Sequence, residues 1–143
     1  MKKIVVINGP NLNLLGVREP KIYGQTTLTE LCTKLQAQSQ QLNIQLQTFQ
    51  SNHEGAIIDR IHEAYFDKAD GIIINPGAFT HYSYAIRDAI SSVQIETVEV
   101  HISNIYERET FRQVSVIEDV VAHRIYGEGL KGYELALHYF NTK

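Results

Sequence analysis

A glutamate and a histidine stand two positions apart in an apolar stretch of the sequence. Glu99 and His101 lie in the β-branched run from 96 to 102, where residues two apart point to the same face of a strand. At that spacing the carboxylate can hold the imidazole in one tautomer, the arrangement of a group that moves protons. For this pair taken alone, a half-exposed strand face of alternating polarity is the more common explanation.

Two arginines follow the same strand. Arg108 and Arg112 are four positions apart, which places them on one face of a short helix. The run from 104 to 107 has the pattern of a helix N-terminus, whose free N–H groups suit a carboxylate ligand. Because Glu107 and Glu109 stand beside the arginines, a solvated charged helix is the alternative.

Another polar group follows the apolar run from 71 to 74. Asn75 begins a turn that contains proline and glycine, and the apolar spacing after it predicts a helix from 80 to 90. His81 and Asp88 are seven positions apart, about two helical turns, so they share a face of that helix. Asn75 could also be only a turn residue that ends a strand.

The segment from 8 to 25 is too long for an ordinary connection. It holds three glycines and two prolines, whereas a strand-to-helix connection usually has about 2–6 residues. It also carries Asn11, Arg18 and Tyr23, an unusual polar set for a connector. The segment leaves the carboxyl end of the first predicted strand, where open α/β sheets bind ligands.

Five short β-branched runs, separated by helical patterns, must position these residues. The predicted strands cover residues 4–7, 44–49, 71–74, 96–102 and 121–125, and the helical patterns cover roughly 27–42, 54–65, 80–90 and 130–140. Thr27 with Glu30, and Ser51 with Glu54, have the spacing of a capping box. We therefore expect an α/β fold, a flavodoxin-like three-layer sandwich with a five-stranded parallel sheet of order 2-1-3-4-5 and helices on both faces.

The composition is that of a small globular protein. The chain has 143 residues, 43% of them hydrophobic and 20% charged, so we expect one domain over residues 1–143. A net charge of −3 with scattered Lys and Arg argues against nucleic acid and for a small anion as ligand. We expect no signal peptide or membrane span, and the single cysteine, Cys32, excludes a disulfide framework and fits the reducing cytoplasm.

Several familiar kinds of site have no counterpart in the sequence. It has no His-Glu-x-x-His or cysteine spacing for zinc, no Gly-x-Ser-x-Gly for a serine nucleophile, and no P-loop or Gly-x-Gly-x-x-Gly. We assign structural positions to the histidines without a partner pattern, His53, His62, His123 and His138. The hypothesis that remains is a proton-transfer enzyme with no metal and no cofactor.

Motifs spread over nearly the whole chain point to one enzyme family. They are Asn8-Gly9-Pro10-Asn11, Arg18-Glu19-Pro20, Tyr23-Gly24, Gln50-Ser51-Asn52-His53-Glu54-Gly55, Asn75-Pro76-Gly77-Ala78, Thr80-His81, Arg87-Asp88, Glu99-Val100-His101-Ile102-Ser103-Asn104, Arg108-Glu109, Phe111-Arg112 and Gly132-Tyr133. In this order and spacing they resemble the type II 3-dehydroquinate dehydratases of the shikimate pathway.

The resemblance implies an activity and its principal residues. The reaction is the reversible dehydration of 3-dehydroquinate to 3-dehydroshikimate, by anti elimination through an enolate and without a cofactor. Tyr23 would be the proton acceptor, His101 the proton donor, and Arg18 the stabiliser of the transition state.

Three more residues are expected to assist this chemistry. Asn11 would stabilise the enolate, as oxyanion donors do. Glu99 would orient His101. Because an ionised tyrosine needs more help than one cation supplies, we expect Arg108 to act beside Arg18.

The resemblance also implies how substrate and other subunits are bound. The substrate carboxylate would sit on the backbone N–H groups of Ile102 and Ser103. The hydroxyls would be bound by Asn75, His81, Asp88 and Arg112. Residues 18–25 would form a lid. Family members are homododecamers, tetramers of trimers in which Asp88 reaches a neighbouring subunit's site, and we expect that assembly here.

Two other classes of function are open from the residues alone. A flavodoxin-like binding module could hold a nucleotide or a flavin at the same strand ends, since one fold hosts many functions. A structural assembly protein could use the same polar residues only as interface contacts. The first would absorb light as a flavoprotein, and the second would keep every activity after Tyr23→Phe.

Overall fold

Five parallel strands lie side by side in the order β2-β1-β3-β4-β5. The structure is a computed structural model that describes residues 1–17 and 19–142, with only the backbone at 22 and 23. The strands are β1 (Lys2–Asn8), β2 (Ile44–Gln50), β3 (Gly71–Asn75), β4 (Thr97–His101) and β5 (His123–Tyr126). The α-helices are α1 (Pro20–Tyr23), α2 (Leu28–Gln41), α3 (Glu54–Phe66), α4 (Tyr84–Val93) and α5 (Lys131–Asn141). Short 3-10 helices are η1 (Leu12–Leu14), η2 (Gly77–His81), η3 (Ile105–Glu107) and η4 (Thr110–Gln113).

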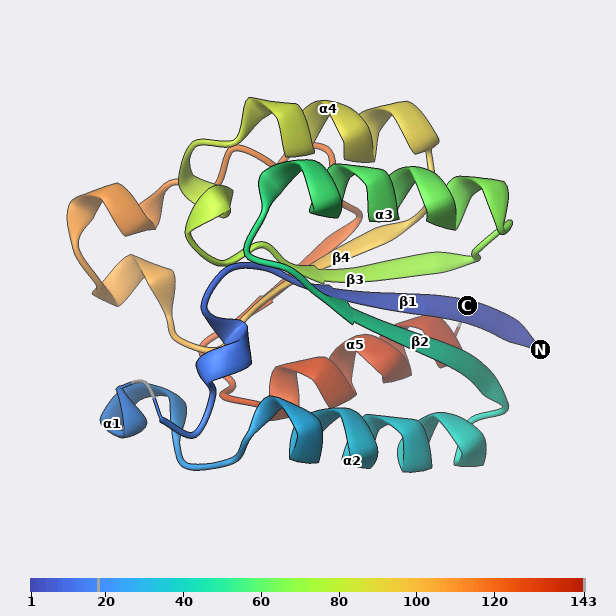
Figure 1. Ribbon diagram of the computed structural model, residues 1–143, viewed down its shortest axis with the longest axis horizontal. Coiled ribbons are helices and arrows are strands. Elements are labelled where there is room, and N and C mark those ends of the chain that lie inside the picture. Colours follow the sequence, from blue (N-terminus) through green and yellow to red (C-terminus); the bar gives the residue numbers. More distant parts are fainter. Residues whose placement is uncertain (18, 143) are drawn as a thin grey trace.

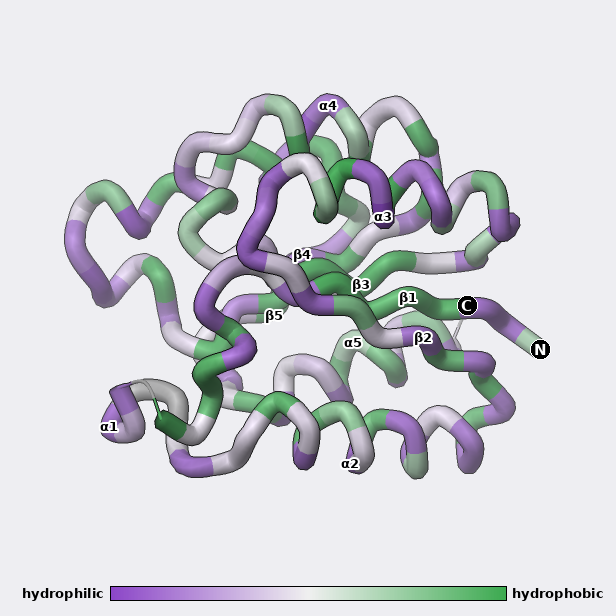
Figure 2. Tube along the Cα trace, viewed as in Figure 1, coloured by the Kyte–Doolittle hydropathy of each residue, from purple (hydrophilic) through white to green (hydrophobic). Residues whose placement is uncertain are grey.

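Helices cover both faces of the sheet, with α3 and α4 on one face and α2 and α5 on the other (Figure 1). Successive side chains of β1 enter opposite cores. Ile4 and Val6 pack toward α2 and α5, whereas Val5 and Ile7 pack toward α3 and α4. This is why the middle of the sheet is continuously hydrophobic in Figure 2, as expected of parallel strands covered on both sides. The predicted sandwich and its strand order are confirmed.

The first long helix begins as the sequence predicts. The Thr27 hydroxyl accepts from the backbone N–H of Glu30, and the Glu30 carboxylate accepts from the backbone N–H of Thr27. The two bonds satisfy N–H groups that have no partner within the helix. Cys32 is half-buried on α2, where burial raises the pKa of its thiol.

The second predicted capping box is wrong. The N-cap of α3 is His53, without a side-chain cap, and the Ser51 hydroxyl accepts from the backbone N–H of His53 instead. The Glu54 carboxylate accepts a 2.5 Å hydrogen bond from the hydroxyl of Ser83. Because Ser83 caps α4, the carboxylate ties the starts of α3 and α4 together rather than closing its own helix.

A continuous helix from 80 to 90 is also wrong. The chain forms η2 up to His81, departs from helical geometry at Tyr82 (φ −154°, ψ −5°), and starts α4 at Tyr84. The break is stabilised because the Ser83 hydroxyl accepts from the backbone N–H of Ile86, which favours a new helix start there. His81 and Asp88 therefore belong to different helices and do not share a helical face.

The segment after β4 forms two 3-10 turns instead of one helix. Asn104 caps η3 through a hydrogen bond from the backbone N–H of Tyr106 to its side chain. Arg108 lies between η3 and η4 in an extended conformation. The four-residue spacing of Arg108 and Arg112 is thus not a helical repeat.

The carboxyl ends of β1 and β3 approach each other closely. Asn8 is paired with Asn75, and the backbone N–H of Gly9 donates to the carbonyl of Asn75 at 2.8 Å. A Cβ atom on Gly9 would lie 2.4 Å from the carbonyl oxygen of Pro76, which leaves room only for glycine. This contact holds together the two strand ends from which candidate site residues leave the sheet.

None of the helices in the described part of the chain has the length and hydrophobicity that crossing a membrane requires.

We predict that Gly9→Ala lowers the free energy of unfolding by about 2 kcal/mol, because the added methyl group overpacks against backbone. The control is Gly55→Ala, at a helical position where an added Cβ meets nothing within 4 Å. That change should keep stability or raise it by up to about 1 kcal/mol through helix propensity. Urea unfolding measures both variants, and equal stability would contradict the role of the close contact.

Candidate active site

A pocket lies at the edge of the sheet where the strands end. It is lined by Pro10, Asn11, Leu12, Asn75, Gly77, Ala78, His81, His101, Ile102, Ser103, Ile105, Arg108 and Arg112. The lining comes from the segments that follow β1, β3 and β4, so residues far apart in the sequence meet there. In Figure 1 these segments and α1 gather at one end of the molecule, opposite the two termini.

Under the pocket lies a hydrogen-bonded pair of buried groups. Glu99 has no exposed surface and His101 is 6% exposed, so the alternative of a half-exposed strand face is wrong. The Nε2 atom of His101 is 2.5 Å from Oε2 of Glu99. A carboxylate only accepts, so Nε2 carries the hydrogen and Nδ1 is the second ring nitrogen of a group that lines the pocket.

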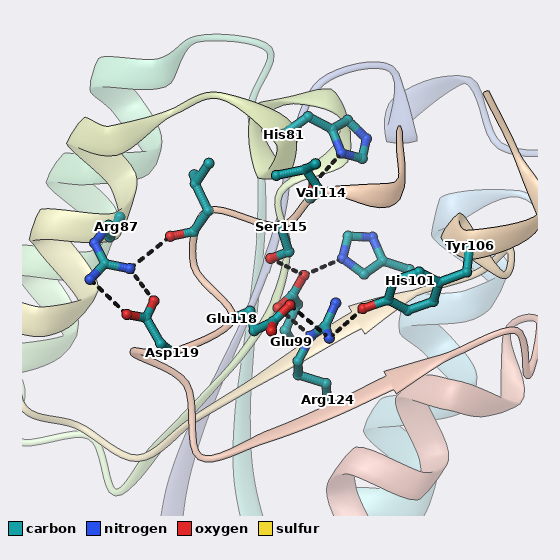
Figure 3. Close-up of polar contacts among 11 residues, drawn as sticks. His81, Arg87, Glu99, His101, Tyr106, Val114, Ser115, Glu118, Asp119 and Arg124 are labelled. Carbon is teal, nitrogen blue, oxygen red and sulfur yellow. Dashed lines mark hydrogen bonds and ion pairs between the residues drawn. The ribbon is translucent and has the colours of Figure 1, made fainter. Parts of the chain in front are cut away.

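Two further groups hold the Glu99 carboxylate (Figure 3). The hydroxyl of Ser115 donates to Oε2 at 2.9 Å, and Nε of Arg124 donates to Oε1 at 3.1 Å. Burial by itself raises the pKa of this carboxyl, but the hydrogen bond and charge of His101, with Arg124 and Ser115, lower it further than burial raises it. The pKa of Glu99 therefore lies below its ordinary value, and Glu99 is ionised at neutral pH.

A second histidine is fixed from another direction. Nδ1 of His81 is 2.7 Å from the carbonyl oxygen of Val114, so Nδ1 donates and Nε2 is left as an acceptor. Burial lowers the pKa of His81, a shift that the Val114 contact only partly opposes. A neutral imidazole with a bare Nε2 can accept a hydrogen bond from a hydroxyl group.

The segment from 114 to 119 carries partners of both histidine sites. Val114 holds His81 and Ser115 holds Glu99, while the carbonyl of Val116 accepts from Arg87 at 2.9 Å. Arg87 also forms a forked ion pair with Asp119. Figure 3 shows that one end of the segment contacts His81 and Glu99, and that the other end contacts Arg87 of α4.

The Asn75 side chain is oriented from below by a buried tyrosine. The hydroxyl of Tyr133 donates to Oδ1 of Asn8 at 2.6 Å and accepts from Nδ2 of Asn75 at 3.0 Å. Oδ1 of Asn75 accepts from the backbone N–H of Gly77 at 3.2 Å. Asn75 is therefore more than a turn residue, because its amide is held in one orientation at the floor of the pocket.

Asn11 stands at the opposite wall in a left-handed conformation, with φ 70°. Its backbone N–H donates to Oδ1 of Asn52 at 3.0 Å, and the same oxygen accepts from Nε2 of Gln50. Residues at the end of β2 thus fix the backbone that presents Asn11 to the pocket.

The arginines give the pocket a positive wall. The side chains of Arg108 and Arg112 are 14% and 22% exposed, so they are not part of a uniformly solvated helix face. Nη1 of Arg108 is 3.5 Å from the hydroxyl of Ser103, and Nη2 is 3.9 Å from the Glu19 carboxylate. Nε of Arg112 pairs with Glu109 at 2.9 Å.

The backbone between the strand and the arginines is also fixed. The carbonyls of Ile102 and Ser103 accept from the N–H groups of Gly129 and Gly127, at 3.0 and 3.1 Å. The loop before α5 therefore sets the orientation of the peptide groups at this wall of the pocket.

Besides Glu99, which lies beneath the pocket, three predicted site residues are not placed in its lining. Asp88 is exposed on α4 and does not line it. Arg18 and the side chain of Tyr23 lie outside the described residues. The backbone at 23 ends α1, and the contact of Glu19 with Arg108 brings the start of that segment to the rim of the pocket.

The described residues contain no group of three or more His, Cys, Asp or Glu side chains arranged to hold a metal ion. His53, His62, His123 and His138 are exposed and do not line the pocket. His123 stacks on Tyr139, with ring centroids 5.1 Å apart.

Comparison with known proteins decides which family has this site. The family model described as Dehydroquinase class II matches residues 2–141. This chain belongs to the class II dehydroquinase family. A 3-dehydroquinate dehydratase of Caldicellulosiruptor bescii is 57% identical over 138 residues, which cover 96% of this chain and 95% of that protein.

Solved structures agree with this assignment. The type II dehydroquinase of Butyrivibrio crossotus has a TM-score of 0.96 at 57% identity, covering 98% of this chain and 97% of its own. That of Propionibacterium acnes has a TM-score of 0.97 at 44% identity, covering 100% and 98%. The family expected from the motifs is confirmed.

Sequence reasoning missed several residues of this dehydroquinase site. Ser115 and Val114 lie in a segment without periodicity, so nothing in the sequence marks them as partners of Glu99 and His81. The sequence does not predict Arg124 as a partner of Glu99, because only the register between β4 and β5 places the two residues opposite each other. For the buried Tyr133, the motif Gly132-Tyr133 was the one available signal.

We predict that Glu99→Gln destabilises the protein by about 3 kcal/mol at pH 7, because it removes the anion from a buried ion pair. Since the folded pKa of Glu99 lies below its ordinary value of 4.5, its contribution is present above that value and is lost as the pH falls through the folded pKa. The difference between wild type and variant should therefore shrink in acid. Urea unfolding at a series of pH values from 7 down to about 3 measures it, with the exposed Glu128→Gln as control. A difference that stays constant would contradict the buried ionised carboxylate.

Proposed function

We propose that this chain catalyses the reversible dehydration of 3-dehydroquinate to 3-dehydroshikimate, by anti elimination through an enolate. One observation carries the proposal: a buried carboxylate holds His101 at 2.5 Å where its ring lines a pocket with two arginines. Relatives that share more than half of this sequence are named 3-dehydroquinate dehydratase, which supports the substrate.

His101 is the proton donor in this proposal. Its Nε2–H stays on Glu99, so the proton that reaches the substrate leaves from Nδ1. The departing hydroxyl takes that proton as the carbon–oxygen bond breaks, and leaves as water. The Glu99 carboxylate stabilises the charged imidazolium before transfer.

Tyr23 is the proton acceptor and must be ionised to act. An ordinary tyrosine has a pKa of about 10, so ionisation at neutral pH needs about 4 kcal/mol of stabilisation. One nearby cation supplies about 1–3 pKa units, which is not enough when burial opposes it. We assign the stabilisation to Arg18 together with Arg108. The approach of Glu19, next to Arg18, to Arg108 at the pocket rim supports this pairing.

Removal of the proton beside the ketone leaves an enolate, whose negative oxygen needs a hydrogen-bond donor. Asn11 lines the pocket on a fixed backbone, and we assign to it the stabilisation of this oxygen. Loss of water from a hydroxy ketone changes no overall oxidation state. Two proton carriers and an anion stabiliser therefore suffice, and the proposal uses no cofactor.

The remaining pocket groups fit a polyhydroxylated carboxylate. The substrate carboxylate is assigned to the backbone N–H groups of Ile102 and Ser103. The substrate hydroxyls are assigned to Asn75, His81 and Arg112, which line the pocket, and to Asp88 of a neighbouring subunit. The bare Nε2 of a neutral His81 accepts from one hydroxyl, and Arg112 donates to another.

Residues 18–25 act as a lid in this proposal and exclude water over the substrate. Gly16 precedes this segment and Gly24 lies near its end, with φ of 90° and 79°, conformations that glycine adopts without strain. We further propose a homododecamer, a tetramer of trimers, in which the exposed Asp88 completes a neighbouring subunit's site. The cytoplasmic location stays a prediction.

Tyr23→Phe should reduce turnover at least about 100-fold, because it removes the base. The conjugated enone of the product, followed in the ultraviolet after addition of 3-dehydroquinate, measures this. The control Tyr65→Phe removes a hydroxyl from an exposed tyrosine on α3 and should leave turnover unchanged. No enone from wild type at saturating substrate would reject the proposed function. Unchanged turnover in Tyr23→Phe would reject the base.

Mixed assemblies test the role of Asp88. Tyr23→Phe and Asp88→Asn chains, unfolded together and refolded, should regain activity that neither has alone, because some sites combine an intact Tyr23 with a neighbour's intact Asp88. Random assortment of an equal mixture restores about one site in four. Absence of recovery in an assembly of full size would mean that Asp88 does not serve a neighbouring site.

A further inference from the structure

Arg124 contacts the catalytic pair from the neighbouring strand. In the β4–β5 register it lies opposite Glu99. Its Nε donates to Oε1 of Glu99 at 3.1 Å, while Nε2 of His101 donates to Oε2 at 2.5 Å. The two oxygens of one carboxylate therefore bind two different groups, the imidazole of His101 and the guanidinium of Arg124 (Figure 3).

The charge of Arg124 is held in a poorly solvated place. Its side chain is 17% exposed, and Glu99 has no exposed surface, so water screens their interaction little. Nη1 of Arg124 donates to the hydroxyl of Tyr106 at 2.8 Å and lies 3.3 Å from the Glu118 carboxylate. Nη2 is buried without a hydrogen-bond partner among the described residues.

Other charged groups face the pair from other elements. His81 in η2 interacts through charge with Glu99, His101 and Arg112 of η4, and Arg108 and Arg112 line the same pocket. On the other side stands Glu118, whose carboxylate is 55% exposed and neutralises Arg124 only in part. Within the described part of the chain, Arg124 is the one permanent cation in ion-pair contact with Glu99.

We propose that Arg124 is a positioning residue, which acts through Glu99 to set the pH range over which the Glu99–His101 pair keeps its transferable proton. The inference rests on the proposed function for the identity of that proton. Glu99 and His101 titrate as a coupled pair, so the relevant quantity is the proton uptake of the pair. A fixed positive charge beside the pair disfavours proton uptake. Arg124 therefore lets His101 release its proton more readily than Glu99 alone would allow.

Two substitutions separate the charge of Arg124 from the shape of its guanidinium group. Arg124→Met removes the charge, and Arg124→Lys keeps the charge on an ammonium group that lacks the planar guanidinium. Titration of the His101 ring by NMR should move to higher pH in Arg124→Met, because a positive charge is lost beside the pair, and much less in Arg124→Lys. The basic limb of the pH profile of kcat/KM should move in the same direction.

Two further variants distinguish the effect of the Arg124 charge on His101 from the effect of a less rigid structure around the pair. Arg87→Met breaks the ion pair that anchors the segment 114–119 but removes no atom that contacts Arg124, Glu99 or His101, so the titration of His101 should move much less than in Arg124→Met. Glu118→Gln removes an exposed carboxylate whose negative charge partly neutralises Arg124. It should shift the titration the opposite way, to lower pH, and it tests the proposal even if Arg124→Met does not fold.

Failure of this inference is distinguishable from failure of the proposed function. NMR titration needs no turnover, so a wild type that forms no enone would reject the reaction and leave the charge effect measurable. An active enzyme whose His101 titration is the same in wild type, Arg124→Met and Glu118→Gln would overturn the inference. So would an equal shift in Arg124→Met and Arg87→Met, which would assign the effect to structure.

Discussion

The Glu99 carboxylate is fully buried beneath the pocket, and a buried charge is stable only where cations and donors surround it. Its partners come from three places: His101 on the same strand, Arg124 on the next strand, and Ser115 on a connecting segment. Removing any one leaves the others around an incompletely paired anion. The orientation of the His101 ring therefore depends on the same contacts that pack this side of the sheet.

The segment between η4 and β5 carries more of the site than its lack of regular structure suggests. Val114 selects the tautomer of His81, and the next residue, Ser115, holds the carboxylate that orients His101. A few residues later the same segment is fixed to α4 through Arg87 and Asp119. Two histidines from different strand ends thus depend on one connection, whose position is set by a helix outside the pocket.

Local patterns predicted this protein well where chemistry and geometry repeat along the chain. The strand runs, the Thr27 capping box and the order of the sheet follow from spacing and alternation. The predicted helix boundaries were wrong where a side chain forms a hydrogen bond with a residue far away in the sequence. Glu54 binds Ser83 rather than closing its own helix, and Ser83 in turn starts α4 anew after His81. His81 and Asp88 consequently lie on separate helices rather than on one shared helical face.

The sequence by itself determined the parallel sheet, the gathering of polar residues at its carboxyl edge, and the family, because these depend on residue types at short spacings. Only the tertiary structure decided that Arg124 faces Glu99, that Tyr133 holds Asn75, and that Val114 fixes His81. Those contacts join residues 25, 58 and 33 positions apart. The strand register and the path of the loops determine these contacts. Both depend on how whole strands and helices pack against each other, which no local sequence pattern specifies.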